Sequence, residues 1–491
     1  MRLEELADAA DAFRLAGDGA VEIADLAYDS RRVGAGTLFF CVPGKKADGH
    51  EFAAAAVAAG AAALVVEREL ELPVPQVVVA DARAAMAPVA ARFWGDPTAE
   101  LKLVGVTGTN GKTTTAFLVR EILEAAGIRC GLLGTVKQVV GGAEEEVERT
   151  TPEAIDLQAT FRRMLDSGDR VCVMEVSSHA LALCRVDAIH FEVALFTNLS
   201  RDHLDFHADM GDYFMSKRRL FAANPGTAIV NVDDDYGVRL AAEFDCLVFS
   251  TVDRNADFAA SDISSDAGGS RFTVTRLEHE TRLRTRLPGA FNVANGLAAF
   301  AAATTLGVDP EAAAAGLEGA AAPPGRFEPI DEGQPFAVLV DYAHTPDSLE
   351  NVLRAARELT DGRLISVFGA GGDRDRGKRP QMGRVGAALS DLAIVTSDNP
   401  RSEDPGAIVE EILGGIDERG GVEVEQDRYA AIELALRRAG PGDTVVIAGK
   451  GHEQGQEFEA GRKVPFDDRE VARSELRRLQ SEGRSPVPGS Q

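Results

Sequence analysis

Short apolar runs alternate with helix-like stretches along almost the whole chain, and this alternation limits the possible folds more than any other feature. Strand-like runs lie at 36–42, 62–67, 75–80, 101–106, 171–176, 193–198, 228–233, 336–341, 363–369, 391–397 and 443–449. Helical stretches that end at a glycine, such as 51–60 and 291–307, lie between some of them. Such alternation is typical of βαβ units and predicts an α/β protein with mostly parallel sheets.

The length of 491 residues is enough for about three domains at usual domain sizes. The turn-like segments DPT (96–98) and PPGR (323–326) are the best candidate boundaries. The predicted domains are therefore 1–98, 99–328 and 329–491, and the last has a Rossmann-like pattern. The tail, 480–491, is low in apolar residues and is predicted to be disordered.

Composition excludes several classes of function. The net charge of −26 argues against nonspecific binding to nucleic acids or anionic membranes. There is no run of 18 apolar residues and no signal-peptide core, so we expect no membrane insertion. The five cysteines lack CxxC spacing, which favours reduced thiols in a cytosolic protein over a zinc site. Basic clusters at 216–221 and 372–380 could still bind small anions.

The segment TGTNGKTTT (107–115) follows a strand-like run and precedes a helical one, which is the context of a phosphate loop. Gly108 and Gly111 would let backbone N–H groups close on phosphates, and Lys112 would reach the β- and γ-phosphates. Thr113 would hold Mg²⁺ through its hydroxyl, at a helix N-terminus that favours anions. Val106 replaces the first glycine of the strict pattern, so a plain glycine-rich turn remains the alternative.

Further polar segments follow later strands. Glu175 ends the strand-like run before SSHAL, where a Mg²⁺-binding carboxylate is expected, although a capped strand end is an equal alternative. TNLSRDHLDFH (197–207) is denser, and His203 is a candidate for a second Mg²⁺. YFMSKRRLF (213–221) would by itself be a solvated helix face.

These segments together resemble the Mur ligases of peptidoglycan assembly, whose relatives include the folylpolyglutamate synthetases. The resemblance covers nearly the whole chain. It continues through FNVANGLAA (291–299), PPGRFE (323–328), DYAHTPDSL (341–349), GGDRDRGKRP (371–380), DNPRSEDP (398–405) and GKGHE (449–453). The later motifs are similar to the branch that adds the third residue of the stem peptide. The family has three domains, with a central P-loop ATPase domain and a Rossmann-like C-terminal domain.

The resemblance implies an ATP-dependent ligase that phosphorylates a carboxylate, so that an amine can attack the acyl phosphate. Its catalytic residues would be Lys112, Glu175, His203 and Lys217. ATP would contact Gly108, Thr109, Asn110, Gly111, Lys112, Thr113, Thr114, Asn292, Asn295, Arg326 and Asp341. Mg²⁺ would be held by Thr113, Glu175, His203 and Lys217, the last as a carbamate. His344 would support the ATP-binding hinge.

The N-terminal domain would bind UDP-N-acetylmuramoyl-L-alanyl-D-glutamate. The residues implied for this substrate are Tyr28, Ser30, Lys45, Lys46, Ala47, His50, Thr150, Thr151, Ser178 and Arg185. Leu183 stands where the family often has glutamine, which puts one substrate contact in doubt. The resemblance also implies a monomer in the bacterial cytoplasm.

The added amino acid would be meso-diaminopimelate, which is lysine with a second carboxylate at its far end. A rigid guanidinium fork suits that carboxylate and penalises lysine. The implied pocket is Arg374, Asp398, Asn399, Pro400, Arg401, Gly449 and Glu453. Alternatives are an L-lysine-adding, D-Ala-D-Ala-adding or folate-glutamate ligase. A nucleotide kinase or regulatory NTPase, and a binding protein with a decayed site, are alternatives of another class.

Overall fold

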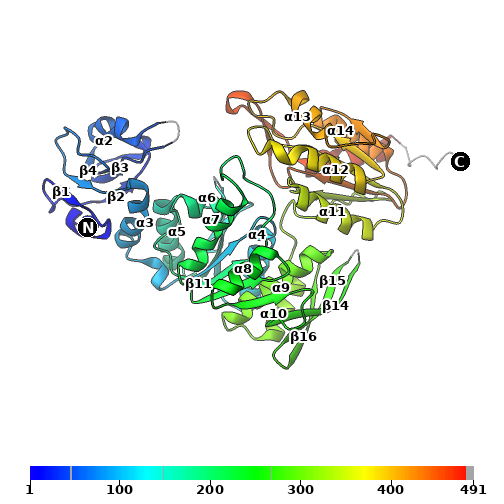
Figure 1. The fold of residues 1–491 in the computed structure, drawn as a ribbon, viewed down its shortest axis with the longest axis horizontal. Helices are drawn as coiled ribbons and strands as arrows, with labels where there is room; N and C mark the ends of the chain where they lie inside the picture. The colour runs from blue at the N-terminus through cyan, green and yellow to red at the C-terminus, as the bar shows by residue number, and fades with distance from the viewer. Residues whose placement is uncertain (45–46, 148, 267, 483–491) are drawn as a thin grey trace. The chain divides into compact units, whose positions relative to one another are not determined.

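The computed structural model describes residues 1–44, 47–147, 149–266 and 268–482, and the chain divides into two compact units (Figure 1). The first unit comprises Met1–Thr107, Gly127–Leu195 and Ser216–Ala228. The second unit comprises Gly108–Ala126, Phe196–Met215 and Ile229–Gln491. Both units contain parts of the predicted central domain, and the boundaries at residues 98 and 328 stay predictions.

The N-terminal part of the first unit is built on a five-stranded sheet. Its strands lie in the order β1 (Arg14–Ala16), β5 (Gln76–Val78), β4 (Ala61–Val66), β3 (Thr37–Phe40) and β2 (Asp25–Ala27), and only β1 is antiparallel to its neighbour. Phe40 and Val65 belong to the core on one face, and Phe39 and Leu64 to the core on the other. Successive residues of a strand face opposite sides, so these continuous apolar runs need cover on both faces. That cover comes from α1 (Leu3–Ala9), α2 (Ala53–Ala58) and α3 (Ala82–Phe93), with 3₁₀ turns at Ser30–Arg32, Gly49–Phe52 and Pro97–Ala99.

A second group of strands in the first unit includes the strand that leads into the phosphate loop. β6 (Lys102–Thr107) and β7 (Cys130–Leu133) pair in parallel with β10 (Val171–Glu175) between them. β8 (Gln138–Val140) and β9 (Ala143–Glu145) continue antiparallel. Further elements are α5 (Ala154–Asp166), α6 (Ser178–Ala182) and β11 (Phe191–Phe196). The chain passes between the units within α7 (Met210–Ala222) and β12 (Thr227–Asn231).

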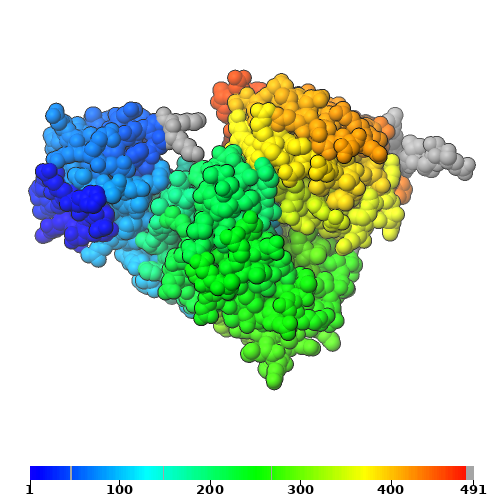
Figure 2. Space-filling model, viewed as in Figure 1, coloured from blue at the N-terminus to red at the C-terminus, as the bar shows by residue number. Residues whose placement is uncertain are grey.

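The second unit contains an antiparallel meander that the sequence did not predict. Its strands are β14 (Phe258–Asp266), β15 (Gly269–Arg276) and β16 (His279–Thr285), and parallel β13 (Leu247–Ser250) joins it to β12. Burial alternates along most of β16, but Leu283 is its single apolar residue, so the strand has no continuous apolar run. The turn between β15 and β16 projects from this unit, and Leu277 in it is 90% exposed (Figure 2). The surrounding helices are α4 (Lys112–Ala125), α8 (Asp235–Glu243), α9 (Ala290–Thr305) and α10 (Pro310–Gly319).

The C-terminal part of the second unit confirms the Rossmann-like prediction. The sheet order is β17 (Glu328–Pro329), β18 (Ala337–Asp341), β22 (Thr444–Ala448), β19 (Leu364–Phe368), β20 (Leu392–Val395) and β21 (Val422–Val424), and all pairs except β17–β18 are parallel. One face packs on α11 (Pro346–Glu358), α12 (Arg379–Leu389) and α13 (Pro405–Leu413), and the other on α14 (Arg428–Arg438) and α15 (Asp468–Ser481). A small hairpin, β23 (Gly455–Glu457) and β24 (Lys463–Pro465), precedes α15.

Helix α15 continues to Ser481, so the first residues of the predicted tail are helical, and 483–491 lie outside the described residues. None of the helices that the structure describes is long and apolar enough to cross a membrane.

Candidate active site

The predicted phosphate loop connects β6 to α4, and glycines set its shape. Gly108 has a φ of +151° and Gly111, the N-cap of α4, has a φ of +87°. A Cβ at position 108 would collide with the hydroxyl of Thr197, so this close approach requires glycine. The N–H groups of Thr109 and Asn110 donate to the backbone and side-chain oxygens of Asn198, each at 2.9 Å. The TNLS segment (197–200) therefore holds the phosphate loop in place through these hydrogen bonds.

The side chains of the loop already meet the predicted ATP-binding residues of the second unit. Lys112 Nζ donates to the carbonyls of Gly108, at 3.0 Å, and Thr109, at 2.8 Å. Arg326 Nη2 donates to Thr113 Oγ1 at 3.0 Å. Thr114, the residue after Thr113, is buried. The lysine thus rests on carbonyls of its own loop, within reach of the positions where phosphate oxygens are expected.

Helix α9 brings two predicted asparagines to this region. Asn295 Oδ1 lies 3.3 Å from Thr115 Oγ1, and Asn295 Nδ2 donates to Asn292 Oδ1 at 3.2 Å. Both asparagines are buried. The structure therefore places the FNVAN motif beside Thr115, and the ATP contacts of its two asparagines stay predictions.

Arg326 also contacts the segment that begins the C-terminal sheet. Its guanidinium lies 4.5 Å from the ring centroid of Tyr342, and the N–H of Phe327 donates to Asp341 Oδ2 at 2.7 Å. His344 Nδ1 lies 2.7 Å from the carbonyl oxygen of Tyr342, within hydrogen-bond distance. Burial raises the pKa of Asp341 from 3.8 to about 6, although Arg326 opposes the rise.

This raised pKa makes the stability of the nucleotide-free protein depend on pH. A carboxyl whose folded-state pKa lies above its unfolded value stabilises the fold fully below the unfolded pKa, and that contribution is lost as pH rises through the folded pKa. A shift from 3.8 to about 6 corresponds to about 3 kcal/mol. We therefore expect Asp341→Asn to gain stability relative to wild type between pH 4 and about pH 7. Urea unfolding of both proteins at several pH values measures this.

Asp443→Asn is a control of opposite sign for that experiment. Arg363 donates to the Asp443 carboxylate and helps to hold the pKa of Asp443 below its ordinary value, despite burial. The stability of this variant relative to wild type should fall as pH rises to the ordinary pKa of 3.8 and change little above it. A difference between Asp341→Asn and wild type that does not change with pH would contradict the raised pKa.

The TNLSRDHLDFH segment forms a charged cluster with the C-terminal part. Asp202 is 5% exposed, and Lys378 Nζ lies 3.5 Å from its carboxylate. His203 Nε2 and His344 Nε2 lie 3.4 Å and 3.8 Å from the same carboxylate. Burial raises the pKa of Asp202, but Lys378 and the histidines outweigh it and hold that pKa well below its ordinary range. Sequence reasoning named His203 and His344 but neither Asp202 nor Lys378.

In the first unit, Glu175 is the last residue of β10 and is 1% exposed. Its carboxylate accepts hydrogen bonds from the N–H of Thr135, at 2.7 Å, and from Thr135 Oγ1, at 3.1 Å. Lys217, on α7, is also 1% exposed. Thr113 and His203 belong to the other unit, so the joint arrangement of the four predicted Mg²⁺ residues stays a prediction.

A second polar cluster in the first unit surrounds Glu153, which is 5% exposed. Arg185 and Arg149 lie 2.8 Å and 2.7 Å from its Oε1, and Arg83 lies 3.4 Å from its Oε2. Arg185 Nη1 also donates to the carbonyl of Thr151 at 3.0 Å. Three guanidinium groups thus meet one carboxylate, and the cluster suits a further anion.

The remaining residues predicted for the uridine substrate lie in the first unit. Tyr28 donates to Asp156 at 2.6 Å, and burial and that carboxylate raise the pKa of Tyr28. Both ring nitrogens of His50 are engaged, Nδ1 with Asp48 at 2.6 Å and Nε2 with the N–H of Glu67 at 3.0 Å. A direct ligand contact through His50 would therefore have to replace one of these bonds.

Four further candidates for this substrate occupy varied environments. Ser30 begins a 3₁₀ turn, Ser178 is buried in α6, and Thr150 Oγ1 lies 3.0 Å from the Thr135 hydroxyl. The carbonyl of Ala47 accepts from the N–H of Gly44 at 2.9 Å. Lys45 and Lys46 lie outside the described residues. Leu183 ends α6 as its C-cap.

The predicted amino-acid pocket lies at the carboxyl ends of β20 and β22. Asn399 Nδ2 donates to Glu453 Oε2 at 2.8 Å, and Lys450 Nζ donates to Asn399 Oδ1 at 2.9 Å. Asp398 is buried, and its Oδ2 has no hydrogen-bond partner among the described residues. Gly449 has a φ of +124°, and a Cβ there would come within 2.5 Å of that Oδ2. The site therefore leaves one buried carboxylate oxygen without a hydrogen-bond donor among the described residues.

Arg401 holds the other side of this pocket. It has a φ of +50°, its Nε donates to Glu457 Oε2 at 3.0 Å, and its Nη1 donates to the Gly372 carbonyl at 2.7 Å. A Cβ on Gly371 would lie 3.0 Å from Arg401 Nη1 and 3.7 Å from the Cγ of Arg374. Both predicted arginines therefore lie next to Gly371, and Pro400 precedes Arg401 in the chain. Sequence reasoning did not name Glu457.

The comparisons with known proteins show the family of this chain. The sequence matches the descriptions "Mur ligase family, catalytic domain" at residues 22–94, "Mur ligase middle domain" at 106–303 and "Mur ligase, glutamate ligase domain" at 325–451. A curated relative from Streptomyces coelicolor, UDP-N-acetylmuramoyl-L-alanyl-D-glutamate–2,6-diaminopimelate ligase, is 47% identical, with 97% of each chain covered. The chain belongs to the Mur ligase family.

Two more proteins show how far the likeness to other Mur ligases extends. The relative of the same name from Geobacter metallireducens is 45% identical, with 98% of this chain and 100% of the relative covered. A solved structure of a ligase of that name matches with a TM-score of 0.70 and 32% identity, covering 98% and 99% of the two chains. The order of the three matched regions gives this Mur ligase the family's three-domain architecture, which confirms the predicted fold.

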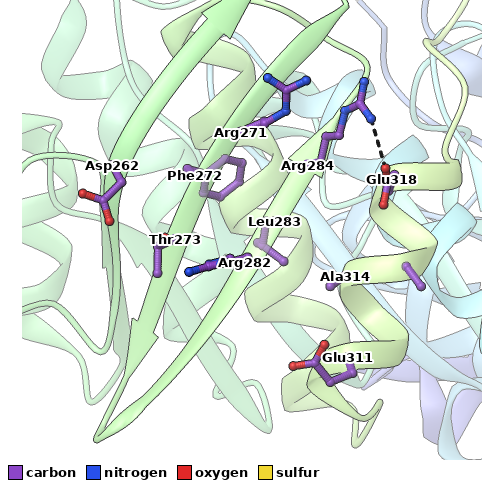
Figure 3. A pocket seen from close by; sticks show the side chains of 11 residues that line it. Asp262, Arg271, Phe272, Thr273, Arg282, Leu283, Arg284, Glu311, Ala314 and Glu318 are labelled. Atoms are coloured by element: carbon purple, nitrogen blue, oxygen red, sulfur yellow. Dashed lines mark hydrogen bonds and ion pairs between the residues drawn. The ribbon is translucent and has the colours of Figure 1, made fainter.

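This Mur ligase also has an open hollow of ≈ 440 Å³ beside its antiparallel meander (Figure 3). It is lined by Asp262, Arg271, Phe272, Thr273, Arg282, Leu283, Arg284, Glu311, Ala314, Ala315 and Glu318. Arg284 and Glu318 pair across it at 3.2 Å. All these residues lie outside the predicted site, and they include both acidic and basic side chains. The hollow is therefore not an alternative location for the active site.

Proposed function

We propose that this Mur ligase uses ATP to join meso-diaminopimelate to the D-glutamate carboxylate of UDP-N-acetylmuramoyl-L-alanyl-D-glutamate. The amino-acid pocket carries this proposal. The open oxygen of Asp398 suits an ammonium group, and the guanidinium fork of Arg401 suits a distant carboxylate. The names of the most similar relatives are consistent with that pair of groups.

The reaction needs an activated carboxylate, because a free carboxylate is a poor electrophile. A substrate carboxylate oxygen would attack the γ-phosphorus of ATP and release ADP. The amine of diaminopimelate would then attack the carbonyl carbon, lose a proton and expel inorganic phosphate. Lys112 and the N–H groups of the phosphate loop would hold the transferring phosphate, and Arg326 would hold the nucleotide near the hinge.

The residues predicted to hold Mg²⁺ would supply mainly oxygen ligands. Hydroxyl and carboxylate oxygens are preferred ligands of Mg²⁺, and Thr113 and the buried Glu175 supply them. His203 and a carbamate on Lys217 would complete the set. Bound Mg²⁺ neutralises crowded phosphate charge.

In the first unit, the arginine cluster around Glu153 would bind carboxylates of the uridine substrate. Arg185 was implied by the resemblance, and the structure adds Arg83 and Arg149 as candidates. Tyr28, Ser30 and the loop that precedes His50 would contact the nucleotide. A monomer in the bacterial cytoplasm is part of the same proposal.

The decisive experiment is amino-acid-dependent ADP release. With ATP, Mg²⁺ and UDP-N-acetylmuramoyl-L-alanyl-D-glutamate present, we expect release with meso-diaminopimelate and little with L-lysine or D-Ala-D-Ala. Release with lysine alone would keep the ligase and overturn the account of Arg401. Phosphate release without any amide product would favour a nucleotide kinase or regulatory NTPase.

A further inference from the structure

Arg428 and Asp468 form a fully buried ion pair behind the amino-acid pocket. Arg428 begins α14 and is 1% exposed, and Asp468 begins α15 and is 0% exposed. The guanidinium donates from Nε and Nη2 to the two carboxylate oxygens, at 2.8 Å and 2.7 Å. Removing two charges from water is costly unless they pair this closely. Burying this pair therefore costs desolvation free energy that apolar side chains in the same place would not cost.

The same guanidinium ties together the two strand ends that lead into the pocket. Nη2 donates to the carbonyl of Ala448, at the end of β22, at 3.0 Å. Nη1 donates to the carbonyl of Ser397, after β20, at 3.4 Å. β19 separates β20 from β22 in the sheet, so no ladder hydrogen bond joins these two ends. The loops with Asp398 and Gly449 thus start from positions that Arg428 fixes.

Arg428 lies near Asp398 without forming a hydrogen bond to it. Arg428 Nη1 is 4.0 Å from Asp398 Oδ2, too far for a hydrogen bond. Nη1 donates to the Ser397 carbonyl, and Nε and Nη2 donate to Asp468 and the Ala448 carbonyl. Burial raises the pKa of Asp398, but Lys450 and Arg428 outweigh it and hold that pKa below its ordinary value. Asp398 is therefore charged, yet no donor covers its Oδ2 among the described residues.

We propose that Arg428 and Asp468 are positioning residues, which keep Asp398 Oδ2 aimed at, and free for, the ammonium group of the incoming amino acid. This inference rests on the proposed function. Asp468 keeps the guanidinium of Arg428 away from Asp398. Arg428 in turn supports the loops that contain Asp398 and Gly449. Neither side chain touches the substrate.

Asp468→Asn tests the anchor with little change in shape. The amide can still accept one hydrogen bond, but it no longer balances the guanidinium charge, so Arg428 should turn to Asp398 and cover Oδ2. We expect the KM for meso-diaminopimelate to rise by about tenfold or more, while the KM for ATP changes by less than about twofold. Arg428→Lys, which keeps the charge but cannot bridge both carbonyls, should show the same split.

Asp443→Asn is the matched control, because it breaks a comparable Arg–Asp pair at the other end of β22. Arg363 donates to Asp443 at 2.8 Å, next to Thr444, the first residue of the strand. This variant should lose stability and leave the ratio of the KM for meso-diaminopimelate to the KM for ATP unchanged. An equal rise in both KM values for Asp468→Asn, or no rise, would overturn the inference. If wild type uses another amino acid, the proposed function is wrong, and the same split measured for that amino acid still decides the inference.

Discussion

Lys217→Ala is expected to lower diaminopimelate-dependent ADP release by about a thousandfold or more, with ATP binding largely kept. Lys217 is 1% exposed on α7, where an unmodified ammonium group would repel a nearby metal ion. A carbamate on this lysine would reverse the charge and provide an anionic oxygen ligand. Alanine provides neither, whereas the phosphate loop, Gly108–Thr113, is unchanged. Steady-state rates and nucleotide titration measure the two effects separately.

Two further variants make the Lys217 experiment specific. Lys217→Arg keeps the positive charge but does not form the carbamate, so it should be as slow as alanine. Arg219→Ala removes a cation from the same helix, where Arg219 pairs with Asp187 at 3.1 Å and is partly exposed, and it should keep normal rates. High bicarbonate should not restore Lys217→Ala. Near-normal turnover of that variant would remove the carbamate from the mechanism.

The sequence predicted the parts of this fold that depend on local pattern. The run LKLVGV became β6, DLAIVTS became β20, and the FNVAN stretch became α9, because buried parallel strands and helices each have a recognisable apolar pattern. The meander β14–β16 was missed because its strands lack a continuous apolar run: β15 alternates apolar and polar residues in RFTVT, and β16 has Leu283 as its single apolar residue. Its cue was a period of two, which a search for continuous apolar runs does not detect.

Within the site, the motifs located residues but not their partners. DNPR named Asp398, Asn399 and Arg401 as candidates, but it could not name Glu457, which accepts a hydrogen bond from Arg401 Nε. The pairs Asp202–Lys378 and Arg428–Asp468 join residues far apart in the chain, and only the tertiary fold brings them together. Lys450 lay inside the GKGHE motif, and its burial against Asn399 is a consequence of packing that composition does not reveal.

The partners of Arg401 sharpen the prediction made from DNPR. Glu457 and the Gly372 carbonyl hold its Nε and Nη1 in place before any substrate arrives. A side chain fixed in this way loses less freedom on binding than a mobile one, which favours a strong and directional contact. The positive φ of Arg401 adds a local cost that the surrounding contacts must offset.

We therefore expect Arg401→Ala to raise the KM for meso-diaminopimelate by about a hundredfold, because the far carboxylate of the amino acid then loses its charged partner. The KM for ATP should hardly change. The low activity with L-lysine should also hardly change, because lysine lacks that carboxylate. The ratio of kcat/KM for the two amino acids would fall accordingly.

Arg376→Ala is the control for Arg401→Ala, since Arg376 lies in the nearby loop, is exposed and pairs with Glu411. Loss of surface charge alone should leave the amino-acid preference intact. If Arg401→Ala weakens ATP and diaminopimelate equally, the guanidinium holds the loop and does not read the substrate. A selective loss instead assigns the choice between diaminopimelate and lysine to this one side chain, because the two amino acids differ only in the group that it would bind.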